Sequence, residues 1–336
     1  MDATGFHPRP LPPGARLAAA ERLVEASGQA ARDTARRIVD SGSSGGIGFE
    51  HAYATIEPGT NRVREVALAV PSPGRSALVF LSRPQSGRER PDERAECVRA
   101  VCQYLAQLPG QPIDIAQSLP AAAERWAIDA LLAANWQTVG SLAYMRRPLR
   151  AEEAARSGLA WAKPGSGEPL PDGLEIEPIR VPGAEEPAPP ELIEALEASY
   201  IDTLDCPDLC GMRETADIIA SHAAIGRQEL ALWSLLRHEG RPAGALLLSC
   251  LPEQRCYELV YLGLGPSLRG NGYGELLMRR AIETLATRVR QSKARAGWSI
   301  TCAVDKANRP AVRLYERLGF APFDSRVACV WSVRPD

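Results

Sequence analysis

The sequence of 336 residues has little lysine, a small net charge and no long apolar run. Only three of its 39 basic residues are lysines, and we attach no chemical meaning to this arginine bias. The formal net charge of -2 gives no support to nucleic-acid binding. The longest apolar run, 243–251, is far too short to span a bilayer, so no membrane association is expected.

The N-terminal stretch MDATGFHPRPLPPG lacks the apolar core of a secretory signal, and we therefore expect a cytoplasmic protein. The eight cysteines are scattered, and several lie in apolar strand or helix patterns, where cysteine behaves as a small hydrophobe. Buried, reduced thiols are the expected state. Cys206 and Cys210 form a C-x3-C pair, but no second pair or nearby histidine completes a zinc site, so we expect no metal.

The composition changes between about 148 and 190, where proline, glycine and acidic residues are dense. Segments such as KPGSGEPLPDG and VPGAEEPAPP are typical of linkers and long loops. The chain is long enough for two domains of ordinary size. We therefore predict a first domain at 1–150, a linker at 151–173 and a second domain at 174–336.

The two halves have similar patterns, which indicates an internal duplication. Each half ends with a strand, a polar turn, a helix that begins near a proline, an aromatic residue and a final strand that closes on Arg-Pro. Trp136 would match Phe320 in this comparison. Residues 41–48, SGSSGGIG, are interpreted as a flexible connector.

The second half gives the clearer order of elements. A strand at 174–181 precedes two helices, three consecutive strands, a helix from about 274, a strand at 298–304 and a short helix at 310–319, and two strands finish the chain. The two early helices are expected at 191–204 and 214–225, and the three strands at 230–240, 241–251 and 256–264. This order predicts a mixed α/β (α+β) fold around a mostly antiparallel sheet flanked by helices.

The segment 258–274, ELVYLGLGPSLRGNGYG, carries the most chemistry. It places Arg269 and three alternating glycines just before a helix, whose N-terminus exposes unpaired N–H groups and favours anions. The glycines allow phosphate oxygens to approach the backbone. A dinucleotide motif needs G-x-G-x-x-G and a Walker loop needs Gly-Lys-Ser/Thr, and both fit this spacing badly.

The segment resembles the acetyl-CoA loop of the GNAT superfamily of N-acetyltransferases, whose pattern is Arg/Gln-x-x-Gly-x-Gly/Ala. Arg269, Gly272 and Gly274 satisfy that pattern. A second stretch, VDKANRPAVRLYERLGF, resembles the family's second signature, with Asn308 and Tyr315 and the closing Gly-Phe. The two motifs cover about 255–322. The whole chain is similar in layout to tandem members of the superfamily, such as the mycothiol synthases, with two GNAT-like domains.

The resemblance implies that acetyl-CoA binds as co-substrate in a wedge between the strands at 257–264 and 298–304. Backbone groups of Leu262, Gly263 and Leu264 would pair with the pantetheine arm. The pyrophosphate would be held by residues 269–274, namely Arg269, Gly270, Asn271, Gly272, Tyr273 and Gly274. Asn308 would touch the cofactor or support its own turn.

The implied activity is transfer of an acetyl group to a primary amine by direct attack in a ternary complex. The resemblance makes Tyr315 the proton donor to the departing thiolate, although periodicity alone favours a core aromatic. Glu258 interrupts an apolar strand, where burial would raise its pKa, and is the candidate base. Two alternatives stay open: Glu258 lies on the solvated face of the strand, or an ordered water acts as the base in its place. A non-catalytic acyl-CoA-binding or regulatory protein is the alternative function.

The acceptor is expected to be a small-molecule or peptide amine, and its identity, the acyl chain length and the oligomeric state stay open. Asp202, Asp205 and Asp208 either form an acidic rim that attracts a cationic amine or belong to a solvated helix end. Asp305 is expected to cap the turn before the second helix.

The first half lacks the corresponding equipment. A rough alignment places Leu131 where the second half has Tyr315, and Glu124 where it has Asn308. The loop SRPQSGRERPDERAE has one glycine and extra charges. We predict that the first domain does not catalyse.

Overall fold

The computed structural model describes residues 6–24, 28–42, 48–85, 90–108, 110, 113–153, 170–183, 186–227, 232–291 and 297–332. Most of the predicted linker and of the 41–48 connector lies outside the described residues. The chain divides into two compact units. Unit 1 comprises Met1–Val139 and Val327–Asp336, and unit 2 comprises Gly140–Arg326.

Unit 1 is built on a sheet with the strand order β1-β2-β3-β4-β5-β12, in which β4 and β5 are parallel. The other neighbouring pairs in this order are antiparallel. Its elements are β1 (Arg9–Pro10), η1 (Pro13–Ala15), α1 (Arg16–Leu23), α2 (Gly28–Gly42), β2 (Ala52–Ile56), β3 (Val63–Ser72), β4 (Ser76–Leu81), α3 (Pro91–Leu105), β5 (Ile115–Ser118), α4 (Arg125–Ala133) and the end of β12 (Ala321–Ser332).

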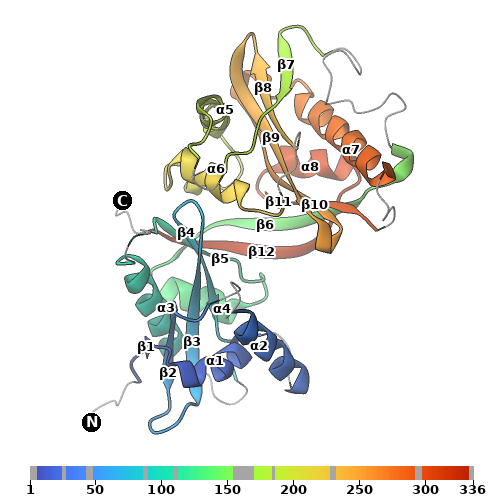
Figure 1. Ribbon diagram of the computed structural model, residues 1–336. Coiled ribbons are helices and arrows are strands. Elements are labelled where there is room, and N and C mark those ends of the chain that lie inside the picture. The colour runs from blue at the N-terminus through green and yellow to red at the C-terminus, as the bar shows by residue number, and fades with distance from the viewer. Residues whose placement is uncertain are drawn as a thin grey trace. The chain divides into compact units, whose positions relative to one another are not determined.

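Unit 2 has the strand order β7-β8-β9-β10-β11-β6, and its one parallel pair among the described strands is β10 with β11. Figure 1 shows α5 and α6 on one side of these strands and α7 and α8 on the other. The elements are β6 (Gln137–Pro148), η2 (Ala151–Glu153), β7 (Leu174–Pro178), α5 (Pro190–Tyr200), η3 (Pro207–Leu209), α6 (Thr215–Ala223), β8 (Trp233–His238), β9 (Arg241–Leu251), η4 (Pro252–Gln254), β10 (Cys256–Leu264), η5 (Pro266–Leu268), α7 (Tyr273–Gln291), β11 (Ser299–Asp305) and α8 (Arg309–Arg317).

The two halves of the chain repeat one order of elements, as the sequence pattern indicates. Each half runs through a strand, two helices, three antiparallel strands, a helix, a parallel strand, a helix and a final strand. The predicted fold class, a mixed and mostly antiparallel sheet flanked by helices in each half, is therefore confirmed.

The final strands pair differently from what the domain boundaries imply. The last strand of the first half, β6, pairs with β11, and the last strand of the second half, β12, pairs with β5. Residues 140–148 consequently belong to unit 2, and residues from 327 onward belong to unit 1. The predicted cuts rested on local composition, which carries no information on pairing between distant segments.

The end of the chain corrects one expectation. Instead of two closing strands, residues 321–332 form one continuous strand, β12. The polar stretch at its middle does not turn, since the Asp324 carboxylate accepts hydrogen bonds from Ser325 N at 2.7 Å and from Arg326 Nε at 2.7 Å. Both bonds are compatible with an extended backbone.

The core of unit 2 makes its central strands a fixed platform. Strand β9 is buried along nearly its whole length, and β8 is buried over its first four residues. Helix α7 packs an apolar face into this core, as the helical period predicts. Fully burying one leucine-sized side chain contributes about 1.5–3 kcal/mol, so the strands that carry the candidate site are firmly held.

Among the described residues, no helix is both long and apolar enough to cross a bilayer. Seven of the eight cysteines are buried, and Cys210 is exposed. No group of three or more His, Cys, Asp or Glu side chains within the described ranges is arranged to hold a metal ion.

Candidate functional site

Strands β10 and β11 separate after a short parallel ladder. Their register runs from Cys256–Ser299 to Leu259–Cys302, and within the described chain it extends no further. At this point β10 has a bulge between Leu259 and Tyr261 against β9, after which it stays paired with β9. A bulge bends the strand that carries it, so β10 turns away from β11 and leaves its backbone edge open. This opening is the predicted wedge.

A pocket of about 590 Å³ occupies the opening. The far part of β10 and the end of β11 line it, together with the α5–α6 connection, the loop before α7 and the first turns of α8. Its lining residues are Ser199, Asp202, Thr203, Leu204, Asp205, Tyr261, Leu262, Gly263, Leu264, Arg269, Gly270, Gly272, Gly274, Glu275, Ala303, Val304, Asn308, Pro310, Ala311, Leu314, Tyr315 and Arg317.

The loop before α7 needs glycine at two positions for its backbone. Gly270 and Gly272 have φ of 79° and 80°, a region that side chains with a Cβ rarely adopt. No described heavy atom lies within 4 Å of where a Cβ would stand at either position. Gly274 differs, because its Cβ would stand 3.4 Å from Leu314 Cδ2, in apolar contact. Two of the three glycines therefore shape an open loop, and the third packs.

Helix α7 begins directly after this loop. Its first backbone bonds run from Glu275 N and Leu276 N to Gly272 O, at 3.1 and 3.0 Å. The N–H groups before them have no carbonyl partner inside the helix, and the helix dipole adds partial positive charge at this end. Because Gly270, Gly272 and Gly274 line the pocket, its wall includes a helix N-terminus suited to an anion.

The Arg269 side chain fixes the loop in place. Its guanidinium donates to Leu264 O at 2.9 Å, to Ser199 O at 2.8 Å and to Asp202 O at 3.1 Å. These carbonyls lie at the end of β10 and at the C-terminal end of α5, where a cation is favourable. The guanidinium thus positions the pocket wall, and its expected contact with a phosphate stays a prediction.

Helix α8 brings Tyr315 to the pocket. Asn308 is its N-cap residue, and its Oδ1 accepts a hydrogen bond from Ala311 N at 3.2 Å. Tyr315 is 6% exposed and packs on Phe320 with the ring centroids 5.5 Å apart. Burial raises the pKa of the Tyr315 phenol well above its usual value, so the hydroxyl stays protonated at neutral pH. Tyr315 is therefore both a core aromatic and part of the pocket wall.

Glu258 lies outside this pocket. It is in register with Ser249 on β9 and with Thr301 on β11, in the paired part of the ladder. It is partly buried, and burial raises the pKa of its carboxyl group, as the sequence suggests for a base. Its role as a base stays a prediction, since the pocket lining does not include it.

Tyr261 and Ser199 form the side of the pocket nearest α5. Their hydroxyls are 2.5 Å apart. A Cβ at Gly263 would stand 2.5 Å from each of these two oxygens, so only glycine fits beneath the pair. The sequence analysis names Gly263 for its backbone alone, and the structure shows that the absent side chain also makes room for the Tyr261 phenol.

A comparison with known protein families matches the part of the chain that forms this pocket. The profile of the acetyltransferase (GNAT) family matches residues 194–320. These residues contain the separated strands, the glycine loop and α8. Residues 194–320 therefore match the GNAT family, and we call this part of unit 2 the GNAT domain.

Comparison with solved structures shows the fold over nearly the whole chain. A GCN5-related N-acetyltransferase from Sphaerobacter thermophilus aligns with a TM-score of 0.50 and 16% identity, covering 97% of this chain and 93% of that one. A tandem GNAT protein from the clavulanic acid biosynthesis pathway aligns with a TM-score of 0.47 and 16% identity, covering 85% and 83%. No curated protein matches the chain.

The GNAT domain collects most of the predicted cofactor residues in one pocket. Leu262, Gly263, Leu264, Arg269, Gly270, Gly272, Gly274 and Asn308 line it. Asn271 and Tyr273 do not. The Asn271 amide instead donates to Ser267 O at 3.3 Å, and Tyr273 packs against the core. Asp305 caps its turn as expected, because its Oδ1 accepts a hydrogen bond from Ala307 N at 2.9 Å.

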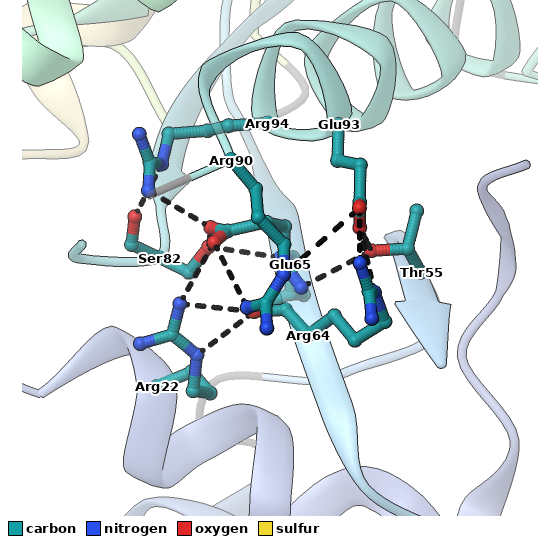
Figure 2. A network of polar contacts seen from close by, with 9 residues as sticks. Arg22, Thr55, Arg64, Glu65, Ser82, Arg90, Glu93 and Arg94 are labelled. Atoms are coloured by element: carbon teal, nitrogen blue, oxygen red, sulfur yellow. Dashed lines mark hydrogen bonds and ion pairs between the residues drawn. The ribbon is translucent and has the colours of Figure 1, made fainter. Parts of the chain in front are cut away.

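Unit 1 has a cluster of charged side chains at the start of α3, the helix that corresponds to α7 in the repeated order of elements. We call the start of each of these two helices, with the residues around it, a junction. Figure 2 shows Glu65 of β3 surrounded by three arginines. Its carboxylate lies 3.2 Å from Arg22, 3.1 Å from Arg94 and 4.0 Å from Arg90. Ser82, in the loop after β4, donates to Glu65 at 2.6 Å. Burial raises the pKa of Glu65, and the arginines oppose part of that shift.

A second ion pair links the loop after β4 to the start of α4. Arg83 pairs with Glu124 at 2.5 Å. The residue before α4 is Glu124, and the residue before α8 is Asn308; Leu131 and Tyr315 each lie seven positions later. The rough alignment of the two halves therefore agrees with the helix starts. No hydroxyl stands at Leu131, in accord with the prediction that this unit does not catalyse, which stays a prediction.

Asp205 is a pocket residue whose place the sequence does not indicate. In the sequence it is one of three acidic residues at a helix end, yet Asp205 and Asp202 line the pocket and Asp208 does not. No local signal separates the three, because the difference arises from a contact with Asp305, 100 residues away.

Proposed function

We propose that the GNAT domain transfers an acetyl group from acetyl-CoA to a primary amine by direct attack in a ternary complex. The observation that carries the proposal is the separation of β10 from β11 at Leu259–Cys302. It opens a pocket whose wall includes both a helix N-terminus and a buried, protonated tyrosine. An acyl donor with an anionic end and a thioester end matches that polarity.

The residues present fit acetyl-CoA as co-substrate. The open backbone edge of Leu262, Gly263 and Leu264 would pair with the amide groups of the pantetheine arm, as an added strand does. The loop at 269–274 and the first amides of α7 would hold the pyrophosphate. The thioester would then lie toward the end of the pocket that Tyr315 lines.

Tyr315 would act as the general acid. The departing thiolate needs a proton, and a phenol that burial keeps protonated can supply it. Glu258 is a candidate base because burial raises its pKa, although it acts at the pocket only through an intervening group such as water. The acceptor would be a small-molecule or peptide amine that reaches the pocket beside the α5–α6 connection.

Thermal unfolding with and without CoA tests the cofactor claim. CoA should raise the melting temperature, because a ligand that binds only the folded state stabilises it. Pantetheine lacks the pyrophosphate and should raise it less. If CoA causes no shift at any concentration, the proposed cofactor is wrong.

Release of free thiol from acetyl-CoA in the presence of a panel of primary amines tests catalysis. Tyr315→Phe keeps the ring and removes the hydroxyl, and kcat should fall by about 10² to 10⁴. Glu258→Gln measures the contribution of that carboxylate. If CoA binds but no amine accelerates thiol release, the alternative of a non-catalytic acyl-CoA-binding protein holds.

A further inference from the structure

Asp205 crosses from the α5–α6 connection to the end of β11, on the pocket wall. Its Oδ1 accepts a hydrogen bond from Asp305 N at 2.8 Å, and its carboxylate also bonds to the Asn308 side chain. These contacts place it at the end of β11 and the start of α8. Asp205 therefore lies on the pocket wall beside the start of the helix that carries Tyr315, near enough for its charge to act on the Tyr315 phenol.

The neighbouring Asp305 is committed to the backbone. It is 4% exposed, and its carboxylate accepts hydrogen bonds from Ala307 N at 2.9 Å and from Cys206 N at 3.3 Å. It does not line the pocket. Asp205 does, so of these two adjacent carboxylates it is the one available to a ligand.

The backbone on each side of Asp205 is held in an uncommon conformation. Asp202 and Cys206 have φ of 51° and 46°, a region that residues with a side chain rarely adopt. Such conformations persist only where the surroundings fix them. Arg269 bonds to Asp202 O, and Asp305 accepts from Cys206 N, so both ends of the segment are fixed.

We propose that Asp205, rather than Glu258, takes the first proton from the acceptor amine. The proposal rests on the proposed function. It follows from position, since Asp205 lines the pocket together with Tyr315 and Glu258 lies outside it. The acceptor class is an amine that is protonated at neutral pH, such as an alkylamine.

The step balances in protons and bonds. The ammonium group gives one proton to the Asp205 carboxylate, and the neutral nitrogen attacks the thioester carbonyl carbon. The C–N bond forms and the C–S bond breaks, and Tyr315 gives its proton to the thiolate. The second proton of the nitrogen returns to the tyrosinate, which leaves an amide, a thiol and a protonated Asp205 that loses its proton to water.

The charges around Asp205 support a base that titrates nearer to neutral pH. Burial raises the pKa of Asp205 and the negative charge of Asp305 adds to that shift, while the hydrogen bonds from Asp305 N and from the Asn308 side chain oppose part of it. The other titratable groups near it are Cys206 on the same connection, Cys302 on β11, Tyr261 on β10 and Tyr315 on α8. The pKa values of these four groups are raised, which keeps them neutral at pH 7, and the charge that acts directly on Asp205 is that of Asp305. Other charged side chains lie on the same connection or line the same pocket, namely Asp202, Asp208, Arg269, Glu275 and Arg317.

A purely structural role for Asp205 can be separated from a chemical one. Asp205→Asn retains the oxygen that accepts from Asp305 N but removes the charge that accepts a proton. Asp172→Asn is the matched control, because Asp172 is an exposed residue outside the pocket lining. Glu258→Gln is the competing variant.

Thiol release from acetyl-CoA is measured with butylamine and with aniline as acceptors. Butylamine is protonated at neutral pH and aniline is not, so only butylamine needs the first proton removed. Asp205→Asn should lower kcat/KM for butylamine by about 10² or more and change the value for aniline less than about threefold. The acidic limb that Asp205 causes in the butylamine profile should be replaced by a rate that rises with pH until butylamine itself is deprotonated, while Asp172→Asn should behave as wild type.

A second readout does not depend on turnover. A carboxyl whose folded pKa is raised costs stability once pH exceeds the pKa of the unfolded chain. Asp205→Asn should therefore melt above wild type at pH 8, and the difference should vanish as pH falls below the ordinary carboxyl range. A lower melting temperature at every pH would indicate a structural role and overturn the proposal.

The remaining outcomes also decide between the assignment of Asp205, the assignment of Glu258 and failure of the proposed function. If wild type turns over butylamine and Asp205→Asn does so equally, the assignment of Asp205 is wrong and the proposed function stands. If Glu258→Gln alone abolishes the acidic limb, the base is Glu258. If wild type accelerates thiol release with neither amine nor with any other amine of the panel, the proposed function fails and the assignment fails with it.

Discussion

The loop before α7 and the loop before α3 occupy the same position in the repeated order of elements, yet their chemistry is opposite. Before α7, Arg269 bonds to three backbone carbonyls, and two glycines leave the helix N-terminus facing a pocket. At the start of α3, charged side chains contact one another instead, and Glu65 of β3 lies within 4.0 Å of three arginines. The first turn of α3 also carries two acidic residues of its own, Asp92 and Glu93.

The difference shows what a duplicated fold retains and what it changes. Both copies keep the strands, the helices and the parallel ladder, because apolar periodicity and burial maintain these. The residues before α7 and α3 differ, although the order of elements is the same in both halves. One junction leaves backbone donors for an external anion, whereas the other supplies its own anions at the helix start, where they interact favourably with the helix dipole.

The largest effect on stability is expected from a substitution in the charged cluster at the start of α3 in unit 1. Glu65→Gln removes a carboxylate that lies within 4.0 Å of each of Arg22, Arg90 and Arg94. Removing one partner of a buried ion pair costs about 3–5 kcal/mol, and the urea midpoint should fall accordingly. Glu96→Gln is the control, since that side chain is 54% exposed and its pair with Arg99 is worth less than about 1 kcal/mol.

Arg269→Lys tests the side chain that fixes the loop before α7 in unit 2. Lysine keeps the charge but cannot reach three carbonyls in the planar geometry of a guanidinium. Losing two charge-assisted hydrogen bonds should cost about 2–3 kcal/mol of stability in urea. If stability and CoA affinity are both unchanged, Arg269 does not position the loop.

Gly272→Ala is expected to act on the ligand. A residue with a Cβ at φ of 80° is strained by roughly 1–2 kcal/mol, and the methyl group would stand on the loop that we propose binds the anion. CoA affinity in a titration should fall about tenfold or more. Gly59→Ala has the matching strain, at φ of 71° in unit 1, and should leave CoA affinity unchanged.

Asn308→Ala gives the smallest of these effects. It removes the side-chain cap of α8, which contributes about 1 kcal/mol, whereas Glu124 makes no side-chain cap at α4. Asn308→Ser keeps a capping oxygen and should restore most of the loss. A difference between the two variants in kcat but not in stability would instead assign Asn308 a direct role at the ligand.

The sequence predicts the local features of this molecule well. The helix at 273–291, the strand at 241–251 and the glycine loop all follow from patterns within about 20 residues, where period and turn chemistry suffice. The pocket was likewise predicted from two motifs that lie 35 residues apart.

Contacts between distant segments account for what could not be predicted. Strand β6 pairs with β11 of the second half, and β12 pairs with β5 of the first half. No local sequence pattern encodes the partner of either strand. Asp205 reaches the pocket through a bond to Asp305, and Arg269 uses its donors on α5 carbonyls. The arginines around Glu65 come from α1 and from the beginning of α3, which only the folded chain brings together.

Calorimetric titration of the full chain with CoA tests the comparison of the two junctions most directly. The account predicts one CoA bound per chain, with affinity that Gly272→Ala weakens and Gly59→Ala does not. Two CoA molecules per chain would show that unit 1 also binds the cofactor, and unchanged affinity in Gly272→Ala would place the site elsewhere. Either result would contradict the assignment of the glycine loop as the single CoA site.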